Sequence, residues 1–187
     1  MEPPKIKMTV DEFLVWAENQ GDRYELVDGI VHGMSPERAG HARAKSRGHR
    51  ALEDAVARAG LLCEAMADGM TVQVDARTAY GPDGLVYCGE RLGDDAIEVP
   101  APVVVVEVLS PSAGFYDRHH KRAGYFAVPS IRHYVMVDLD RRMVIHHARD
   151  GDAIRTRLLP SGPLRLDSPG LDLAVEDLFG PGDSAPP

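Results

Sequence analysis

Residues 102–109, Pro-Val-Val-Val-Val-Glu-Val-Leu, constrain the fold more than any other stretch of this chain. β-Branched residues favour strands, and a strand that is apolar at successive positions has no face for water. Such a strand belongs in the centre of a sheet that is covered on both sides. The run therefore predicts an α/β protein with a central sheet, in which the acid Glu107 needs an explanation.

The N-terminal part of the chain carries signals for a helix and a hairpin. Thr9 and Glu12 have the spacing of a capping box, so they predict a short helix that ends before Gly21. Asp28-Gly29 separates two short apolar runs, which is the pattern of a two-residue β-hairpin. We therefore expect the chain to open with a helix and an antiparallel strand pair.

Predicted strands and helices follow one another along the remaining chain. Residues 36–59 contain no proline after the first position and are followed by Gly60, which predicts a long helix. The 187 residues fit one domain over 1–180, and the Pro- and Gly-rich residues 181–187 are expected to form a flexible tail. Further strands are predicted at 61–66, 70–74, 85–88, 102–109, 131–137, 143–147 and 153–159, with a helix at 117–127.

The charge balance limits the kind of partner. The chain has 29 acidic and 21 basic residues, which gives a formal net charge of −8. This argues against a protein that coats nucleic acid, because such affinity comes from Lys and Arg that neutralise phosphates. A nuclease is still compatible with it, because a carboxylate-lined metal site is itself acidic and basic residues can gather on one face.

The cysteines and the hydropathy pattern indicate where such a protein works. Cys63 and Cys88 have no metal-ligand spacing and form no dense disulfide framework, so we expect reduced thiols. No apolar run reaches the length of about 18 residues that a membrane helix needs, and the N-terminus lacks the apolar stretch of a signal peptide. We expect a soluble, cytoplasmic protein without a membrane partner.

Three side chains indicate a specific chemistry: Asp83 after Gly81-Pro82, Glu107 at the end of the valine strand, and Lys121 on the helix that follows. Mg²⁺ and Mn²⁺ prefer oxygen ligands, and carboxylates on two neighbouring strand ends can hold one such ion. The ion lowers the pKa of a bound water, and a nearby lysine positions or deprotonates that water. The pattern indicates metal-dependent hydrolysis of a phosphodiester.

Each of these residues also has a purely structural interpretation. Glu107 could reach solvent or pair with Arg118, Asp83 could belong to a Pro-Asp-Gly turn, and Lys121 could be a solvated helix residue. Scattered histidines favour no zinc site: His41, His49, His119, His120, His146 and His147. One basic series on the long helix is either a solvated face or a surface that contacts DNA phosphates: Arg38, Arg43, Lys45, Arg47 and Arg50.

The order of motifs resembles the Uma-type family of restriction-endonuclease-like proteins, a bacterial branch of the PD-(D/E)XK nucleases that was formerly a domain of unknown function. The resemblance runs from about residue 8 to about residue 179. It implies a restriction-endonuclease-like core, with a central mixed β-sheet flanked by helices, an N-terminal hairpin and C-terminal antiparallel strands. The motifs that carry it are Arg-Tyr-Glu-Leu-Val-Asp-Gly (23–29), Ser-Pro with His41, Pro-Asp (82–83), Val-Val-Glu-Val-Leu-Ser-Pro-Ser (105–112), Asp-x-x-x-Lys-x-x-x-Tyr (117–125) and Tyr-Val-Met-Val-Asp (134–138).

The resemblance assigns roles to individual residues. It implies that Asp83 is the motif aspartate and Glu107 the motif acid. Leu109 occupies the position of the motif lysine, so that role passes to Lys121 on the next helix. Glu25 matches the upstream acid that often completes the metal site, although it could equally face solvent on its hairpin strand.

The resemblance also implies a function. The metal ligands would be Asp83, Glu107, Glu25 and the backbone carbonyl of Val108, and the ion would be Mg²⁺ or Mn²⁺. The activity would be that of a DNA endonuclease, working as a homodimer because cutting both strands needs two sites. Two alternatives remain open: a nuclease-fold module that binds nucleic acid or assembles with little or no turnover, and an enzyme for another phosphate ester.

Overall fold

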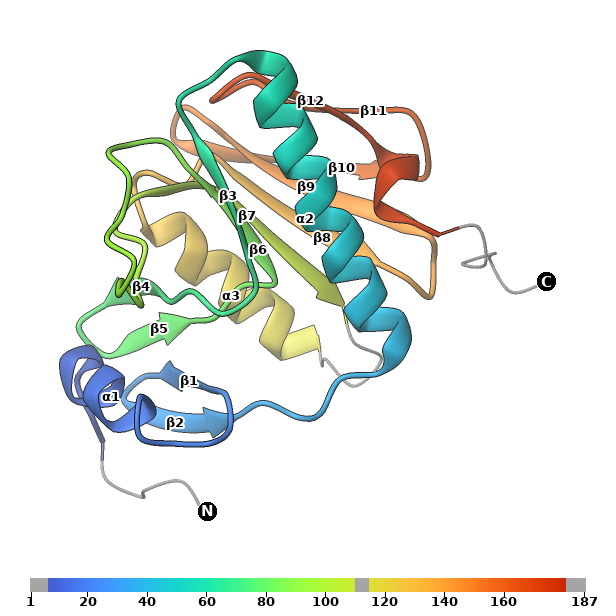
Figure 1. Cartoon of the computed structure of the whole chain (residues 1–187). Helices are drawn as coiled ribbons and strands as arrows, with labels where there is room; N and C mark the ends of the chain where they lie inside the picture. The colour runs from blue at the N-terminus through green and yellow to red at the C-terminus, as the bar shows by residue number, and fades with distance from the viewer. Residues whose placement is uncertain (1–6, 110–114, 181–187) are drawn as a thin grey trace.

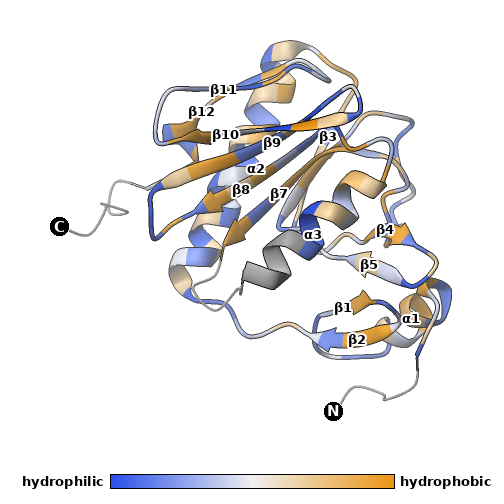
Figure 2. Ribbon diagram, turned by 180° about the vertical axis from the view of Figure 1, so that it is seen from behind, coloured by the Kyte–Doolittle hydropathy of each residue, from blue (hydrophilic) through white to orange (hydrophobic). Residues whose placement is uncertain are grey.

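The computed structural model of the protein describes residues 7–109 and 115–180, and the side chains of these residues except 115–119. A mixed β-sheet forms the centre, and helix α2 lies against one of its faces (Figure 1). Helix α3 covers the other face, as the view from behind shows (Figure 2). The predicted α/β class, with a central mixed sheet flanked by helices, is confirmed.

The helices begin and end where local signals place them. The Thr9 side chain accepts a hydrogen bond from the Glu12 amide, and the Glu12 side chain accepts one from the Thr9 amide, so the predicted capping box is confirmed. Gly60 ends α2 with a φ of 62°, a left-handed conformation that glycine adopts without strain. The helices are α1 Val10–Ala17, α2 Ala39–Ala59, α3 Phe115–Ala127 and the 3₁₀ helix η1 Val175–Leu178.

The strands form three sheets. The central sheet has the order β10-β9-β8-β7-β6-β3, the smaller N-terminal sheet has the order β2-β1-β5-β4, and β11 pairs with β12. In the central sheet β7 pairs antiparallel with β6 and parallel with β8. The strands are β1 Tyr24–Val27, β2 Ile30–Gly33, β3 Glu64–Ala67, β4 Val72–Asp75, β5 Thr78–Tyr80, β6 Gly84–Tyr87, β7 Pro102–Leu109, β8 His133–Asp138, β9 Met143–Asp150, β10 Ala153–Leu159, β11 Pro163–Leu166 and β12 Leu171–Ala174.

The valine strand β7 has a neighbour on each side and a core on each face, as its sequence predicts. Val106 and Val108 pack into the core beneath α2. Val105 and Leu109 pack into the core that includes α3. Because side chains alternate along a strand, Glu107 points to the α3 face together with Val105 and Leu109.

Some features differ from the sequence-based expectations. The expectation of free thiols is wrong, because Cys63 and Cys88 form a disulfide. These cysteines directly precede β3 and directly follow β6, whose paired ends place them opposite each other with Cα atoms 4.1 Å apart. Strands β5, β11 and β12 were not predicted, and the predicted tail, 181–187, lies outside the described residues. Among the helices of 7–109 and 115–180, none is long and apolar enough to cross a membrane.

Two buried histidines form a pair between β8 and β9. The Nδ1 atom of His133 lies 3.0 Å from Nε2 of His146, and the two residues are 4% and 3% exposed. Burial lowers the pKa of each imidazole to about 4, because the charged form loses its hydration. Both side chains are therefore neutral in the folded protein at neutral pH.

We expect this pair to make the protein sensitive to acid. The unfolded imidazoles take up protons near pH 6.5, whereas the folded ones resist protonation until about pH 4. The contribution of the pair to the free energy of unfolding should therefore fall as the pH drops from about 6.5 to about 4, by roughly 2–3 kcal/mol for each histidine. Urea unfolding across this range measures the slope. A His133→Phe/His146→Leu variant should lose the part of this slope that the pair contributes, and a slope equal to that of wild type would contradict the assignment.

Candidate functional site

The two predicted motif acids lie at the adjoining ends of β6 and β7. Asp83 directly precedes β6, and Gly84 pairs with Val106 on β7. The backbone N–H of Val108 donates a hydrogen bond of 2.7 Å to Oδ2 of Asp83. Asp83 is 6% exposed, so it is held against the neighbouring strand and is not a surface turn residue.

On the α3 face, four side chains form a connected group, the Lys121 cluster: Glu25, Glu107, Lys121 and Tyr125. The Lys121 ammonium lies 2.8 Å from Oε1 of Glu25 and 3.1 Å from Oε1 of Glu107. The Tyr125 hydroxyl donates to the same Glu107 oxygen at 2.7 Å. The backbone N–H of Gly81 donates to Glu25 at 3.1 Å. Glu25 lies on β1 of the smaller sheet, and Lys121 links it to Glu107 on the central sheet.

Burial and charge shift the pKa values in the Lys121 cluster. Burial is the main cause that raises the pKa of Glu107 to about 7, and the negative charges of Asp83 and Glu25 raise it further, against the opposing effect of Lys121. Burial opposes the charged form of Lys121, but the carboxylates of Glu107 and Glu25 outweigh it and hold the lysine pKa well above its ordinary value. Negative charge in this cluster therefore exceeds what one ammonium neutralises.

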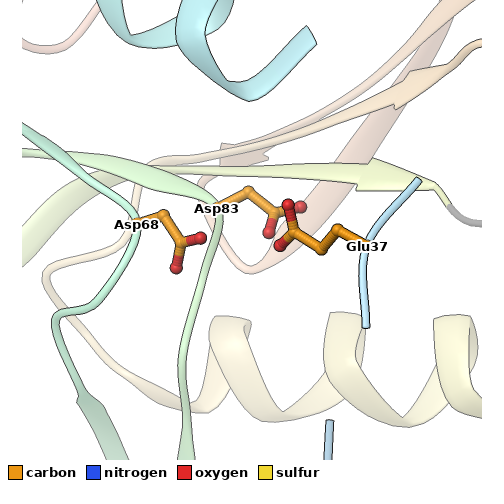
Figure 3. A group of neighbouring side chains, drawn as sticks. All are labelled: Glu37, Asp68 and Asp83. Atoms are coloured by element: carbon orange, nitrogen blue, oxygen red, sulfur yellow. The ribbon is translucent and has the colours of Figure 1, made fainter. Parts of the chain in front are cut away.

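On the α2 face, a second group surrounds Asp83, the Lys45 cluster: Glu37, Lys45, Asp68 and Asp83. The Lys45 ammonium lies 2.9 Å from Oδ1 of Asp83 and 2.5 Å from Oδ2 of Asp68, and it also contacts Glu37. Figure 3 shows the three carboxylates converging from separate segments, and one oxygen of each lies within 4.8 Å of the others. This cluster offers three hard oxygen donors around one buried cation.

His41 lies beside two of the expected metal ligands. Its Nε2 atom is 2.7 Å from the carbonyl oxygen of Val108 and 3.9 Å from Oδ2 of Asp83. The Val108 carbonyl and Asp83 therefore face the same space next to the N-terminal part of α2. These donors are oxygen atoms of the kind that Mg²⁺ and Mn²⁺ prefer, so the residues present fit such an ion.

Comparison with known proteins shows the family and the fold of this chain. Residues 10–176 match the model of the Uma2 family, which is described as "Putative restriction endonuclease". The chain belongs to the Uma2 family. The restriction-endonuclease-like resemblance that the sequence motifs indicate is therefore confirmed.

Individual relatives cover most of the chain. An uncharacterized protein of Synechocystis sp., slr1290, is 29% identical over 179 residues, which are 94% of this chain and 93% of the relative. A second one, sll1609, is 24% identical over 148 residues, 78% of this chain and 82% of the relative. A crystal structure from Anabaena variabilis, described as that of a "putative nuclease belonging to DUF820", has a TM-score of 0.72 at 18% identity, covering 92% of this chain and 97% of that one. That likeness shows the shared fold.

Within the Uma2 fold, the structure brings all the sequence-predicted site residues to one end of β6 and β7. It also separates the two motif acids, because Glu107 lies on the α3 face with Lys121 whereas Asp83 lies on the α2 face with Lys45. Glu25 and Lys121 pair with each other and are largely buried, with side chains 11% and 13% exposed, so neither is a solvated surface residue. The side chain of Arg118, a suggested partner of Glu107, lies outside those described.

Part of the site was not predicted from the sequence. The expectation that Lys45 belongs to a series on a solvated or DNA-contacting helix face is wrong for this residue, since Lys45 is 7% exposed. Its spacing of four residues from His41 places both on one face of α2 and is a signal that could have been used. Nothing local to Glu37 or Asp68 marks them, because only the folding of the chain brings them to Lys45.

Proposed function

We propose that this protein is a Mg²⁺- or Mn²⁺-dependent endonuclease that hydrolyses phosphodiester bonds in DNA. The observation that carries the proposal is the position of Asp83 and Glu107 at adjoining strand ends. Asp83 accepts from the Val108 N–H on the α2 face, and Lys121 lies between Glu107 and Glu25 on the α3 face. Membership of the Uma2 family, which is described as "Putative restriction endonuclease", supports it.

The residues divide the work of such a reaction. Asp83, Glu107, Glu25 and the Val108 carbonyl would hold the ion, which when bound lowers the pKa of a water ligand and offsets charge on the phosphate. The raised pKa of Lys121 keeps its ammonium protonated at neutral pH. In this proposal Lys121 therefore donates hydrogen bonds to the water or to a phosphate oxygen, and it does not act as the base.

DNA is proposed as the substrate because basic residues gather on α2 despite the acidic net charge. Arg38, Arg43 and Arg50 are exposed on this helix, whose buried face carries His41 and Lys45 to the site. Such arginines provide contacts to phosphates that position a duplex without reading its sequence. We also propose a homodimer, because cutting both strands of a duplex requires two sites.

A specific observation favours one alternative, a nuclease-fold module that binds nucleic acid with little turnover. The Lys45 ammonium contacts Asp83, so a cation of the protein already neutralises one of the proposed metal ligands. If no divalent ion displaced this ammonium, the protein would bind nucleic acid without cleaving it.

A plasmid assay tests the proposal. Supercoiled DNA incubated with the protein should be nicked in Mg²⁺ or Mn²⁺ and left intact in EDTA, and an Asp83→Asn variant should leave it intact in either ion. RNA and nucleotides assayed in parallel separate a different phosphate-ester substrate from DNA. Gel-shift binding without nicking at protein excess, in any divalent ion, would support the binding module and reject the endonuclease.

A further inference from the structure

We propose that Lys45 is a positioning residue of the candidate metal site, with its buried ammonium acting as an internal counter-ion that competes with a divalent ion for Asp83. The proposal deepens the proposed function, since it takes Asp83 to be a metal ligand. It concerns the binding step alone, so it is measurable without turnover.

The contacts of Asp83 support this role. Its two carboxylate oxygens are held from different elements, Oδ2 by the N–H of Val108 at 2.7 Å and Oδ1 by Lys45 at 2.9 Å. The carboxylate is therefore fixed in orientation before any ion binds. An ion that uses Oδ1 must take the place that the lysine ammonium occupies.

The surroundings of Lys45 make its charge matter. The same ammonium contacts Glu37 and lies 2.5 Å from Asp68, and the side chain is 7% exposed. Arg23 also pairs with Asp68 and lies 3.9 Å from Glu37, at the partly exposed edge of the cluster. Removing the Lys45 charge would leave three converging carboxylates with this arginine at their periphery, an arrangement that attracts a divalent ion.

Lys45 could instead only stabilise the fold, and the two roles predict opposite changes in metal affinity when its charge is removed. A structural ion pair that is lost loosens Asp83, which weakens or leaves unchanged the binding of an ion. A competing counter-ion that is lost strengthens the binding. The direction of the change in affinity therefore distinguishes the two roles.

Titration calorimetry with Mn²⁺ tests the proposal on the full-length protein. Lys45→Met keeps the length of the side chain and removes its charge, and it should bind Mn²⁺ at least tenfold more tightly than wild type. Lys45→Arg should retain the wild-type affinity, and Lys45→Met/Asp83→Asn should lose the gain. Equal or weaker Mn²⁺ binding by Lys45→Met, including no binding by either protein, would overturn the proposal.

A second variant keeps the test decisive if Lys45→Met does not fold. Glu37→Gln leaves the ammonium with fewer carboxylates to share, so it should weaken Mn²⁺ binding at least threefold, and unchanged affinity would overturn the proposal. The outcome is separate from that of the plasmid assay. Tighter Mn²⁺ binding by Lys45→Met without any DNA nicking would reject the endonuclease and retain the counter-ion, whereas nicking with unchanged affinity would do the reverse.

Discussion

The Glu107→Gln variant is expected to nick DNA at least about 10³-fold more slowly than wild type, equivalent to roughly 4 kcal/mol of transition-state stabilisation. The amide keeps the size of the side chain and an oxygen that can accept from Tyr125 and Lys121. It removes the negative charge that the proposed ion needs. Glutamine also resembles the protonated acid, which is already well populated near neutral pH because burial raises the pKa of Glu107 to about 7.

The fold of this variant should therefore survive. The pKa of Glu107 is about 7 in the folded protein and about 4.5 in the unfolded one, so the unfolded protein loses this proton first. The free energy of unfolding therefore falls as the pH rises from about 4.5 to about 7. Above that range the neutral amide no longer carries this cost, so Glu107→Gln should be at least as stable as wild type at pH 8. Single-turnover nicking in saturating Mn²⁺ and urea unfolding provide the two measurements.

A matched control is available in another half-buried acid. Burial also raises the pKa of Glu98, which lies outside the Lys121 and Lys45 clusters. Glu98→Gln should nick DNA at the wild-type rate. A Glu107→Gln rate within tenfold of wild type would show that this carboxylate is not needed for the reaction.

The parts of the fold that sequence predicts well are those that local physics determines. Four successive valines leave a strand no solvent face, so the valine run by itself predicts that β7 lies inside the sheet. Asp28-Gly29 and the Thr9 capping box work in the same way, since each depends on residues only a few positions apart. The Lys121 contact with Glu107 joins residues 14 apart on successive elements, so the family motif contains both partners.

The missed features depend on partners that are distant in sequence. The residues around Lys45 in the sequence are those of a solvated, arginine-rich helix. Only the docking of α2 on the sheet buries Lys45 against Asp83. The disulfide depends on the pairing of β3 with β6, which places Cys63 opposite Cys88 although their spacing resembles no known framework. Strand β5 is three residues long, too short for alternation to identify.

Replacing Lys121 with methionine is expected to lower the free energy of unfolding by roughly 3–5 kcal/mol at pH 7.5. The ammonium contacts both Glu25 and Glu107, whose side chains are 11% and 12% exposed. Without it, two nearly buried carboxylates would lie near each other and lose the cation that they share. Methionine fills the space of the lysine stem, so the change measures the loss of charge more than the loss of volume.

The pH dependence of this loss separates the charge effect from packing. Burial raises the pKa of Glu107 to about 7, so protonation neutralises this acid as the pH falls. The difference in unfolding free energy between wild type and Lys121→Met should therefore shrink from pH 7.5 toward pH 5. The exposed Lys7 provides the control, and Lys7→Met should change stability by less than about 0.5 kcal/mol. Adding Glu25→Gln to Lys121→Met removes one of the two carboxylates that repel each other. It should restore about half of the lost unfolding free energy. A deficit that is the same at pH 5 and pH 7.5, and is unaffected by Glu25→Gln, would mean that Lys121 stabilises the fold through its packing and not through its charge.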